Sequence, residues 1–109
     1  MTVLELVNIL KATGYPVAYS HFESTEKNPA PDPPFICYVL PQTDNFMADN
    51  KTYHNISSVD IELYTDFKDF EAEQKLENLL DLYEIPWNSY EAYIESEKMY
   101  QKLYEVRLI

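Results

Sequence analysis

One stretch near the middle of the chain restricts the fold more than any other. Between residues 52 and 65, apolar side chains alternate with polar or amphipathic ones. The apolar set is Val59, Ile61 and Leu63, and the alternate set is Asp60, Glu62 and Tyr64. Because successive side chains of a strand point to opposite faces, this period of two predicts a strand over 52–65 with one buried face. The chain must therefore build a sheet that has apolar material packed against one side.

A helical pattern follows directly. We predict that Asp66 caps a helix, and that Pro86 stops it. Its apolar stripe recurs at helical spacing and consists of Ala72, Leu76, Leu79, Leu80 and Tyr83. The opposite face carries the carboxylates of Asp69, Glu71, Glu73, Glu77 and Asp81. With Lys75 nearly alone among them, few ion pairs are expected there, so tertiary packing must hold this helix.

The other predicted elements are shorter. Thr2 and Glu5 have the spacing of a capping box, and Gly14 stands where a left-handed cap would end a helix, so we predict a helix over 3–12. Aromatic and β-favouring runs, together with alternating polarity near the end of the chain, predict four more strands. These strands cover residues 17–22, 35–40, 90–94 and 100–108, the last two forming a hairpin around the polar break at 95–98.

These elements together predict an α+β fold in a single domain over residues 1–109. We expect a mainly antiparallel β-sheet with two α-helices packed on one face, because hairpin-like connections join most of the strands. The Pro-rich segment at about 23–34 resists both helix and sheet, and we expect a mobile surface loop there. The polar span 42–51 is predicted to be a second loop.

The charge of the chain excludes several functional classes. The formal net charge is -11 at pH 7, whereas proteins that read nucleic acids or bind anionic membranes do so with clustered Lys and Arg. The single glycine argues against the glycine-rich loops that cradle phosphates. No basic segment followed by an apolar stretch opens the chain, and no apolar run is long enough to span a bilayer.

Cys37 is the lone cysteine, and its apolar neighbours predict a buried strand residue.

Residue types that carry catalysis are sparse. His21 and His54 are the only imidazoles, and neither has a Ser or Cys arrangement that suggests a triad. Asp44 and Asp49 lie in one loop, but their spacing does not match a calcium loop and the glycine needed for its turn is missing. We therefore expect no enzyme activity, no metal and no cofactor. The ten tyrosines exceed what a core of this size encloses easily, so several are expected at protein interfaces.

Four segments of the chain resemble a known family. They are PVAYSHF at 16–22, DNFMADN at 44–50, IELYTDFKDFEAEQKLENLL at 61–80 and YIESEKMYQ at 93–101. Together they are similar to the small tail-terminator, or tail-completion, proteins of siphophages and of prophages in Gram-positive bacteria. The likeness follows the order of the segments over nearly the whole chain, and it is weakest in the Pro-rich segment.

The resemblance implies a structural role in the virion and no catalytic residues. Such proteins form a homo-hexameric ring at the head-proximal end of the tail tube, where they end tube polymerisation and offer a docking surface to the head connector. The implied partners are copies of the chain itself, the major tail tube protein and a neck protein, with assembly in the cytoplasm of the bacterial host and DNA only passing through the channel. As a hypothesis, the 44–50 loop lies at a subunit or ring-partner interface through Asp44, Asn45, Phe46, Met47, Ala48, Asp49 and Asn50.

Charge suggests a further hypothesis about such a ring. Between residues 60 and 97 the acidic residues far outnumber the two lysines, so Glu73, Glu77 and Asp81 are candidates for a negative channel wall from which DNA phosphates are repelled. Two alternatives stay open. The chain is also compatible with a neighbouring head-closure or neck adaptor, and with an acidic DNA mimic that blocks a host protein by presenting carboxylates in place of phosphates.

Overall fold

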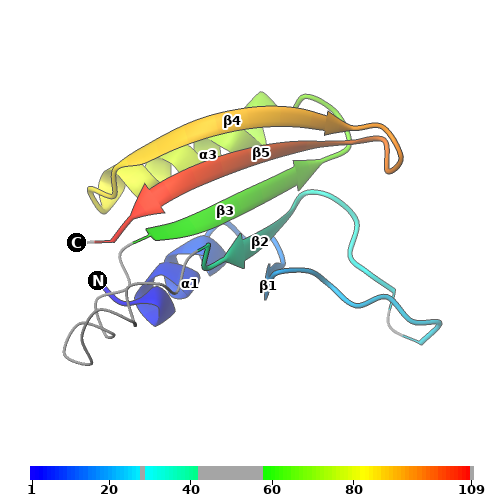
Figure 1. Cartoon of the computed structure of the whole chain (residues 1–109), viewed down its shortest axis with the longest axis horizontal. Helices are drawn as coiled ribbons and strands as arrows, with labels where there is room; N and C mark the ends of the chain where they lie inside the picture. Colours follow the sequence, from blue (N-terminus) through cyan, green and yellow to red (C-terminus); the bar gives the residue numbers. More distant parts are fainter. Residues whose placement is uncertain (28, 42–57, 109) are drawn as a thin grey trace.

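Five strands form one sheet, and two helices lie on one of its faces, in the computed structural model, which describes residues 1–27, 29–41 and 58–108 (Figure 1). The elements are α1 (Val3–Lys11), β1 (Val17–Tyr19), β2 (Phe35–Val39), β3 (Ser58–Thr65), α3 (Phe70–Leu82), β4 (Trp87–Ile94) and β5 (Met99–Arg107). The strand order is β1-β2-β3-β5-β4, with β1 parallel to β2 and every other pair antiparallel. The predicted α+β class, with a mainly antiparallel sheet, is confirmed.

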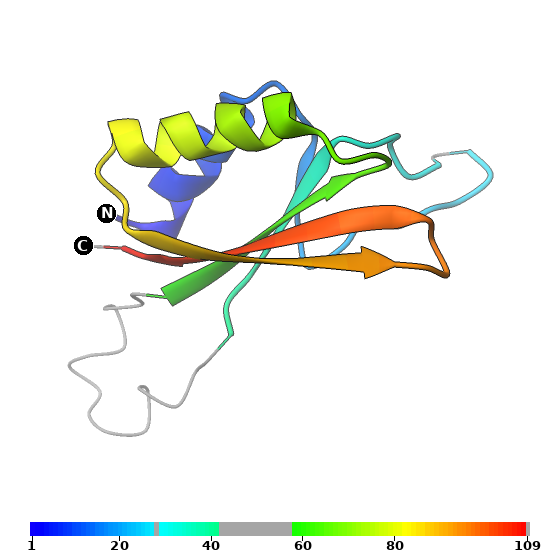
Figure 2. The same cartoon turned by 90° about the horizontal axis from the view of Figure 1, so that it is seen from above.

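The alternation of apolar and polar side chains along β3 sets the two faces of the sheet. Val59, Ile61 and Leu63 are at most 1% exposed and face the helices, whereas the residues between them are only half-buried. In the described part of the chain β3 begins at Ser58, so the predicted portion from 52 to 57 lies outside what the structure describes. Figure 2 shows α1 and α3 together on one side of the sheet. No helix of the described residues lies on the opposite side.

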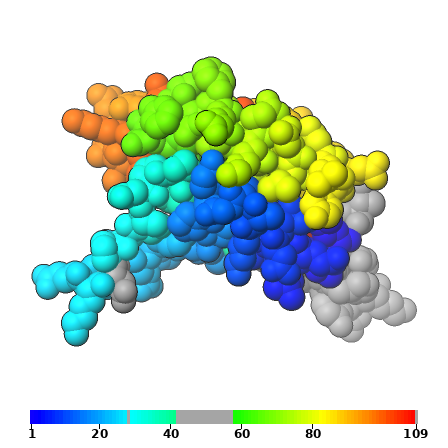
Figure 3. Space-filling view, turned by 180° about the vertical axis from the view of Figure 1, so that it is seen from behind, coloured from blue at the N-terminus to red at the C-terminus, as the bar shows by residue number. Residues whose placement is uncertain are grey.

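The core lies between the sheet and this helix layer. Leu6 and Leu10 of α1 and Leu76 and Leu80 of α3 are fully buried against the inward side chains of the strands. Seen from the helix side, α1 and α3 pack beside each other (Figure 3). Burying one such leucine stabilises the fold by about 1.5–3 kcal/mol, so the two apolar stripes account for the position of both helices.

The first helix begins as its sequence predicts. The hydroxyl of Thr2 accepts a hydrogen bond from the backbone N–H of Glu5 at 3.1 Å, and the Glu5 carboxylate accepts one from the N–H of Thr2 at 2.9 Å. Both halves of the capping box are therefore present. After the helix, Gly14 adopts a φ of 86°, the left-handed conformation expected of it. The chain then turns into β1.

The second helix begins later than predicted. Its N-cap is Asp69 rather than Asp66, and Oδ1 of Asp69 accepts a hydrogen bond of 3.0 Å from the N–H of Ala72. Asp66, Phe67 and Lys68 form the turn that leaves β3, with Phe67 60% exposed. Two aspartates stand within one helical turn, and the residue pattern alone does not distinguish which of them caps the helix.

The structure shortens one predicted strand and confirms the predicted terminal hairpin. The first strand is shorter than the predicted 17–22, because Ser20 has a φ of 68° and ends β1 after Tyr19. The terminal hairpin is confirmed, with β4 and β5 paired from Trp87 opposite Val106 to Ile94 opposite Met99. In the described part of the Pro-rich segment the chain forms neither helix nor strand, as predicted.

Candidate functional site

The residues predicted to form an interface loop fall outside the description. Asp44, Asn45, Phe46, Met47, Ala48, Asp49 and Asn50 all lie in the span 42–57, as does His54. Their assignment to a subunit contact therefore stays a prediction.

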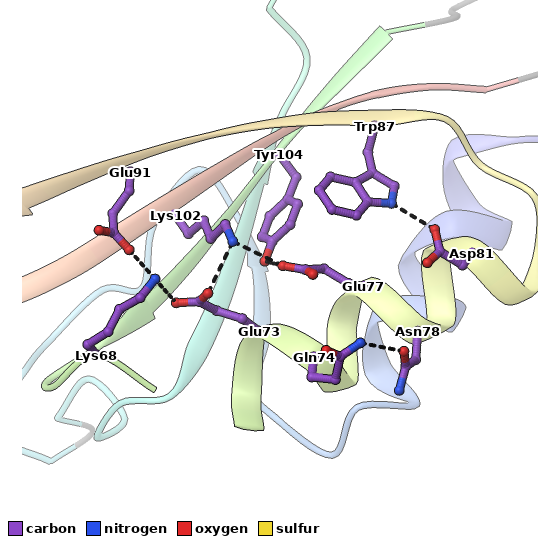
Figure 4. A network of polar contacts seen from close by, with 10 residues as sticks. All are labelled: Lys68, Glu73, Gln74, Glu77, Asn78, Asp81, Trp87, Glu91, Lys102 and Tyr104. Carbon is purple, nitrogen blue, oxygen red and sulfur yellow. Dashed lines mark hydrogen bonds and ion pairs between the residues drawn. The ribbon is translucent and has the colours of Figure 1, made fainter. Parts of the chain in front are cut away.

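The three acidic residues predicted to line a channel do not behave alike. Glu73 is only 7% exposed and points from α3 toward the sheet, as does Glu77, while Asp81 is exposed and accepts a hydrogen bond of 2.9 Å from the Trp87 indole (Figure 4). The expectation that Glu73 and Glu77 stand unpaired on a solvated helix face is wrong. On a helix with 3.6 residues per turn, Glu73 lies only about 20° from Leu80, on the flank of the apolar stripe.

A polar network joins α3 to the terminal hairpin. Nζ of Lys102 on β5 donates to Glu73 at 3.1 Å and to Glu77 at 3.0 Å. Nζ of Lys68 donates to Glu73 at 2.7 Å and also to Glu91 of β4. Figure 4 shows these side chains meeting in the layer between helix and sheet. Two lysines from distant parts of the chain thus neutralise the acidic flank of α3.

The pKa shifts in this network follow from its geometry. Burial on its own would raise the pKa of Glu73, but hydrogen bonds from Lys68 and Lys102 outweigh burial and hold that pKa below its usual range. Burial would likewise lower the pKa of Lys102, and its bonds to Glu77 and Glu73 instead raise it. Glu73 and Lys102 are therefore both held in their charged forms, which suits a structural clamp better than a proton-transfer site.

The opposite face of the sheet offers a different surface, here called the open face. It consists of the strand residues that point away from the helices: Phe35, Cys37 and Val39 of β2; Ser58, Asp60, Glu62 and Tyr64 of β3; Met99, Gln101, Leu103, Glu105 and Arg107 of β5; and Asn88, Tyr90, Ala92 and Ile94 of β4. Facing pairs share a side in an antiparallel ladder, so the register fixes this set. Apolar, aromatic and acidic side chains mix on it.

One corner of the open face is aromatic. The ring of Phe35 stacks on Tyr64 with centroids 5.0 Å apart, and Phe22, from the segment after β1, meets Phe35 edge-on at 5.4 Å. The Tyr64 hydroxyl donates to Glu62 at 3.1 Å and accepts from Gln101 at 2.9 Å. A hollow of about 360 Å³ lies between this corner and the tip of the terminal hairpin at Ile94 and Met99.

Cys37 and Glu62 lie in the same corner and are shielded from water. Cys37 is 2% exposed, as predicted for a strand cysteine, and burial, with a smaller contribution from Glu62, raises the pKa of its thiol to about 11. Burial also raises the pKa of Glu62. Burial and the neighbouring Glu62 carboxylate raise the pKa of Tyr64 to about 12. Neither the Cys37 thiol nor the Tyr64 phenol is tuned to exchange protons near neutral pH.

The other end of the open face is acidic. Asp60 of β3 stands directly opposite Glu105 of β5, and both border a hollow of about 420 Å³ with Asn88 and Arg107. Burial and the charge of Glu105 raise the pKa of Asp60. Like charges at facing positions destabilise a sheet, so this pair is costly in the isolated chain.

Comparison with known proteins gives a plain result. No family model, curated protein or solved structure matches this chain. Across residues 1–27, 29–41 and 58–108, no cluster of three or more His, Cys, Asp or Glu side chains is arranged to hold a metal ion. In the same ranges, no helix has the length and apolar content needed to cross a bilayer. His21 is exposed after β1, with Nδ1 at 3.2 Å from the Ser20 hydroxyl.

Of the surfaces described, the open face is the candidate site. On the helix side Glu73 and Glu77 are held in ion pairs with Lys68 and Lys102, whereas the open face presents half-buried apolar groups and the facing carboxylates of Asp60 and Glu105. The alternation along β3 was predicted from the sequence. The full set of residues on the open face was not, because that set depends on which strands lie side by side. The arrangement fits binding by shape and charge.

Proposed function

We propose that this chain is a tail-terminator type protein of a tailed bacteriophage, which assembles as a homo-hexameric ring at the head-proximal end of the tail tube. In this role it ends tube polymerisation and receives the head connector. The proposal rests first on the resemblance of four ordered segments to that family. It needs a surface through which copies of the chain can pack, and the open face is our candidate.

The mixed character of the open face is the observation that carries the proposal. Half-buried side chains such as Phe35, Tyr64 and Leu103 gain stability when a neighbour covers them. The main core cluster lies on the helix side of the sheet, and outside the corner around Cys37 the apolar residues of the open face remain partly exposed in the single chain. A subunit contact would cover them.

Charge suggests which surface of the neighbour fits. Asp60 and Glu105 are acidic on the open face, while Lys11 of α1 and Lys75 of α3 are exposed on the helix layer. A ring needs two different patches that meet head to tail, so that each subunit uses one toward each neighbour. Packing the open face of one copy against the helix layer of the next satisfies this geometry and brings opposite charges together.

Electron microscopy of tails made with and without the protein tests the proposed role. We expect over-long or headless tails in its absence, and tails of normal length when it is supplied. Normal, head-bearing virions made without the protein would contradict the proposal. The same assay separates the neighbouring role, because loss of a head-closure adaptor leaves tails of normal length and affects only joining.

Charge reversal tests the proposed contact. Glu105 is exposed, so the Glu105→Lys variant should fold normally. It should nevertheless prevent ring assembly and give over-long tails. Adding Lys75→Glu or Lys11→Glu to the same chain should restore assembly, because the charges of the contact are then exchanged. Asp32→Lys, an exposed change in the Pro-rich segment, is the matched control. Failure of Glu105→Lys to affect assembly would exclude the open face as the ring contact.

The acidic DNA-mimic alternative predicts other partners. A mimic would bind a DNA-binding host protein through Asp60 and Glu105, and it would compete with duplex DNA for that protein. Competition that Asp60→Asn with Glu105→Gln abolishes, combined with normal tails in the absence of the chain, would favour the mimic over the terminator.

A further inference from the structure

The strand β4 forms a long free edge of the sheet. It is paired with β5 at every residue from Trp87 to Ile94, without a bulge, and β5 is its only neighbouring strand among the described residues. Natural proteins protect such edges with charged side chains, especially lysine, with proline, with bulges or with very short strands. The sequence of β4, WNSYEAYI, contains neither lysine nor proline. The opposite edge is different, because β1 has three residues and ends at the left-handed Ser20.

The backbone register shows which groups of β4 point outward. The N–H of Arg107 donates to the carbonyl of Pro86 at 3.3 Å, so the facing pair of residues 86 and 107 is hydrogen-bonded. In an antiparallel ladder such pairs alternate with non-hydrogen-bonded ones. The residues of β4 whose N–H and C=O groups point away from β5 are therefore Trp87, Ser89, Glu91 and Tyr93. Among the described residues no strand pairs with this row of donors and acceptors, and Glu91, its one charged member, is paired with Lys68 of its own chain.

A second copy of the same strand can satisfy this row only in certain registers. Residues that face each other must lie on the same side of the joined sheet, so a twofold axis perpendicular to the sheet has to pass through a residue of β4. An axis at Glu91 would place two carboxylates opposite each other. An axis at Ser89 would pair only the first part of the strand. An axis at Tyr90 pairs the strand from Trp87 to Tyr93.

The Tyr90 register also matches side chains. It sets Trp87 against Tyr93, Ser89 against Glu91, and Asn88 against Ala92, with Tyr90 facing its own copy. Tyr90 is 59% exposed and Tyr93 is 51% exposed, so both rings have area to bury. Facing aromatic pairs stabilise sheets, and no like charges meet. Glu91 is already paired with Lys68 within its own chain.

We infer that β4 pairs antiparallel with β4 of a second copy about a twofold axis at Tyr90, which joins two five-stranded sheets into one of ten strands. This contact goes beyond the ring, because a twofold contact uses one patch twice, whereas the ring joins two different patches. The hydrogen bonds of this contact come from the outward backbone groups of β4, whereas the ring contact uses side chains of the open face, to which Tyr90 also belongs, so the edge contact is tested on the purified chain rather than through tail assembly. Each copy carries a formal charge of -11, so added salt strengthens the pair by screening repulsion.

Cysteine cross-linking tests the register. In a non-hydrogen-bonded pair the facing Cα atoms are about 4.5 Å apart, within the range of about 4.4–6.8 Å that a disulfide spans. Tyr90→Cys should therefore cross-link to its own copy when oxidised glutathione accepts the two electrons. Ala92→Cys, two residues along on the same face, would lie about 13 Å from its own copy at roughly 3.3 Å per residue and should not cross-link. Cys37 is buried and leaves the background clean.

Sedimentation provides the second measurement on the full chain. The unmodified protein should form a dimer that strengthens with ionic strength, and Tyr90→Lys should make it monomeric by setting two ammonium groups opposite each other. Tyr83→Lys is the matched control, because Tyr83 is similarly exposed, at 50%, but lies at the end of α3 rather than on β4. Circular dichroism confirms that each variant folds. A monomer at every concentration and salt, a dimer indifferent to Tyr90→Lys, or equal cross-linking of both cysteine variants would overturn the inference.

Discussion

The fully buried phenol of Tyr104 on β5 donates a hydrogen bond of 2.7 Å to Oε2 of Glu77 on α3. The same oxygen accepts from Lys102, whose ammonium lies 5.4 Å from the centroid of the Tyr104 ring. A carboxylate, a phenol and an ammonium from two distant segments thus share one point between helix and sheet. This contact explains why an acidic helix packs closely on a sheet that has few basic residues.

Removing the Tyr104 hydroxyl should destabilise the fold without changing its shape. In Tyr104→Phe the ring still fills the core, but Glu77 loses a hydrogen bond to its charged carboxylate, and such bonds contribute about 1.5–3 kcal/mol. We expect the free energy of unfolding in urea to fall by about that amount. Tyr19→Phe, at a tyrosine that is 50% exposed, is the control and should change it by less than about 0.5 kcal/mol. Equal effects of the two changes would show that the bond to Glu77 adds no stability.

Neutralising Glu73 should be more costly than neutralising its neighbour on the helix surface. Glu73→Gln leaves the ammonium groups of Lys68 and Lys102 without the carboxylate that bridges them, and we expect a loss of about 2–3 kcal/mol, discounted because both lysines reach solvent. Glu71→Gln, on the exposed side of the same helix, should have almost no effect. Chemical denaturation measures both variants, and a similar loss for both would mean that the bridge is not stabilising.

The contribution of Glu73 to the free energy of unfolding should also depend on pH, and it should be lost as pH falls. Its pKa is lower in the folded chain than the ordinary value of 4.5, so the unfolded chain binds a proton first as pH falls. The stabilisation is therefore complete above about pH 4.5 and is lost as pH drops through the folded value. The difference in unfolding free energy between the native chain and Glu73→Gln should shrink over that window. A difference that is constant from pH 7 to the acid limit would contradict the ion-pair account.

The facing carboxylates of Asp60 and Glu105 should have the opposite effect on stability, lowering it as pH rises. The pKa of Asp60 is raised above 3.8, so the folded chain holds a proton at a pH where the unfolded chain has released it, and stability falls as pH rises through that window. Asp60→Asn should stabilise the isolated chain at pH 7 by about 0.5 kcal/mol, within the range for facing pairs. Glu105→Gln should do the same, and the double variant should gain less than the sum. Thermal unfolding of all four chains checks this, and additive gains would show that the two groups do not interact.

Cys37 should react only when the sheet opens. Its thiol is 2% exposed and its pKa is raised to about 11, so the reactive thiolate is scarce at pH 7 and shielded from reagents. We expect alkylation by iodoacetamide to be slow in buffer and fast in urea. Ser20→Cys adds a second thiol at an exposed position and should react at once in the folded protein. Rapid labelling of Cys37 in buffer would mean that this corner opens frequently.

Local patterns determined the elements of this fold. The alternation at Val59, Ile61 and Leu63, the capping box at Thr2 and Glu5, and the polar break at 95–98 each act over a few residues. Periods of two and of 3.6 decide which side chains share a face, whatever the rest of the chain does. For that reason the class of fold, with one sheet covered by two helices on one face, was predictable from the residues alone.

Contacts between distant segments were decided only by the tertiary structure. Asp69 rather than Asp66 caps α3. Glu73 can be buried rather than solvated because Lys68 and Lys102 reach its carboxylate from outside the helix. The open face likewise gathers its side chains from β2, β3, β5 and β4, whose order along the sheet differs from their order along the chain. Apart from the β4–β5 hairpin, no local pattern encodes which strands lie side by side. The sequence by itself therefore set the faces of each element, while the packing of those elements set which charges and rings meet.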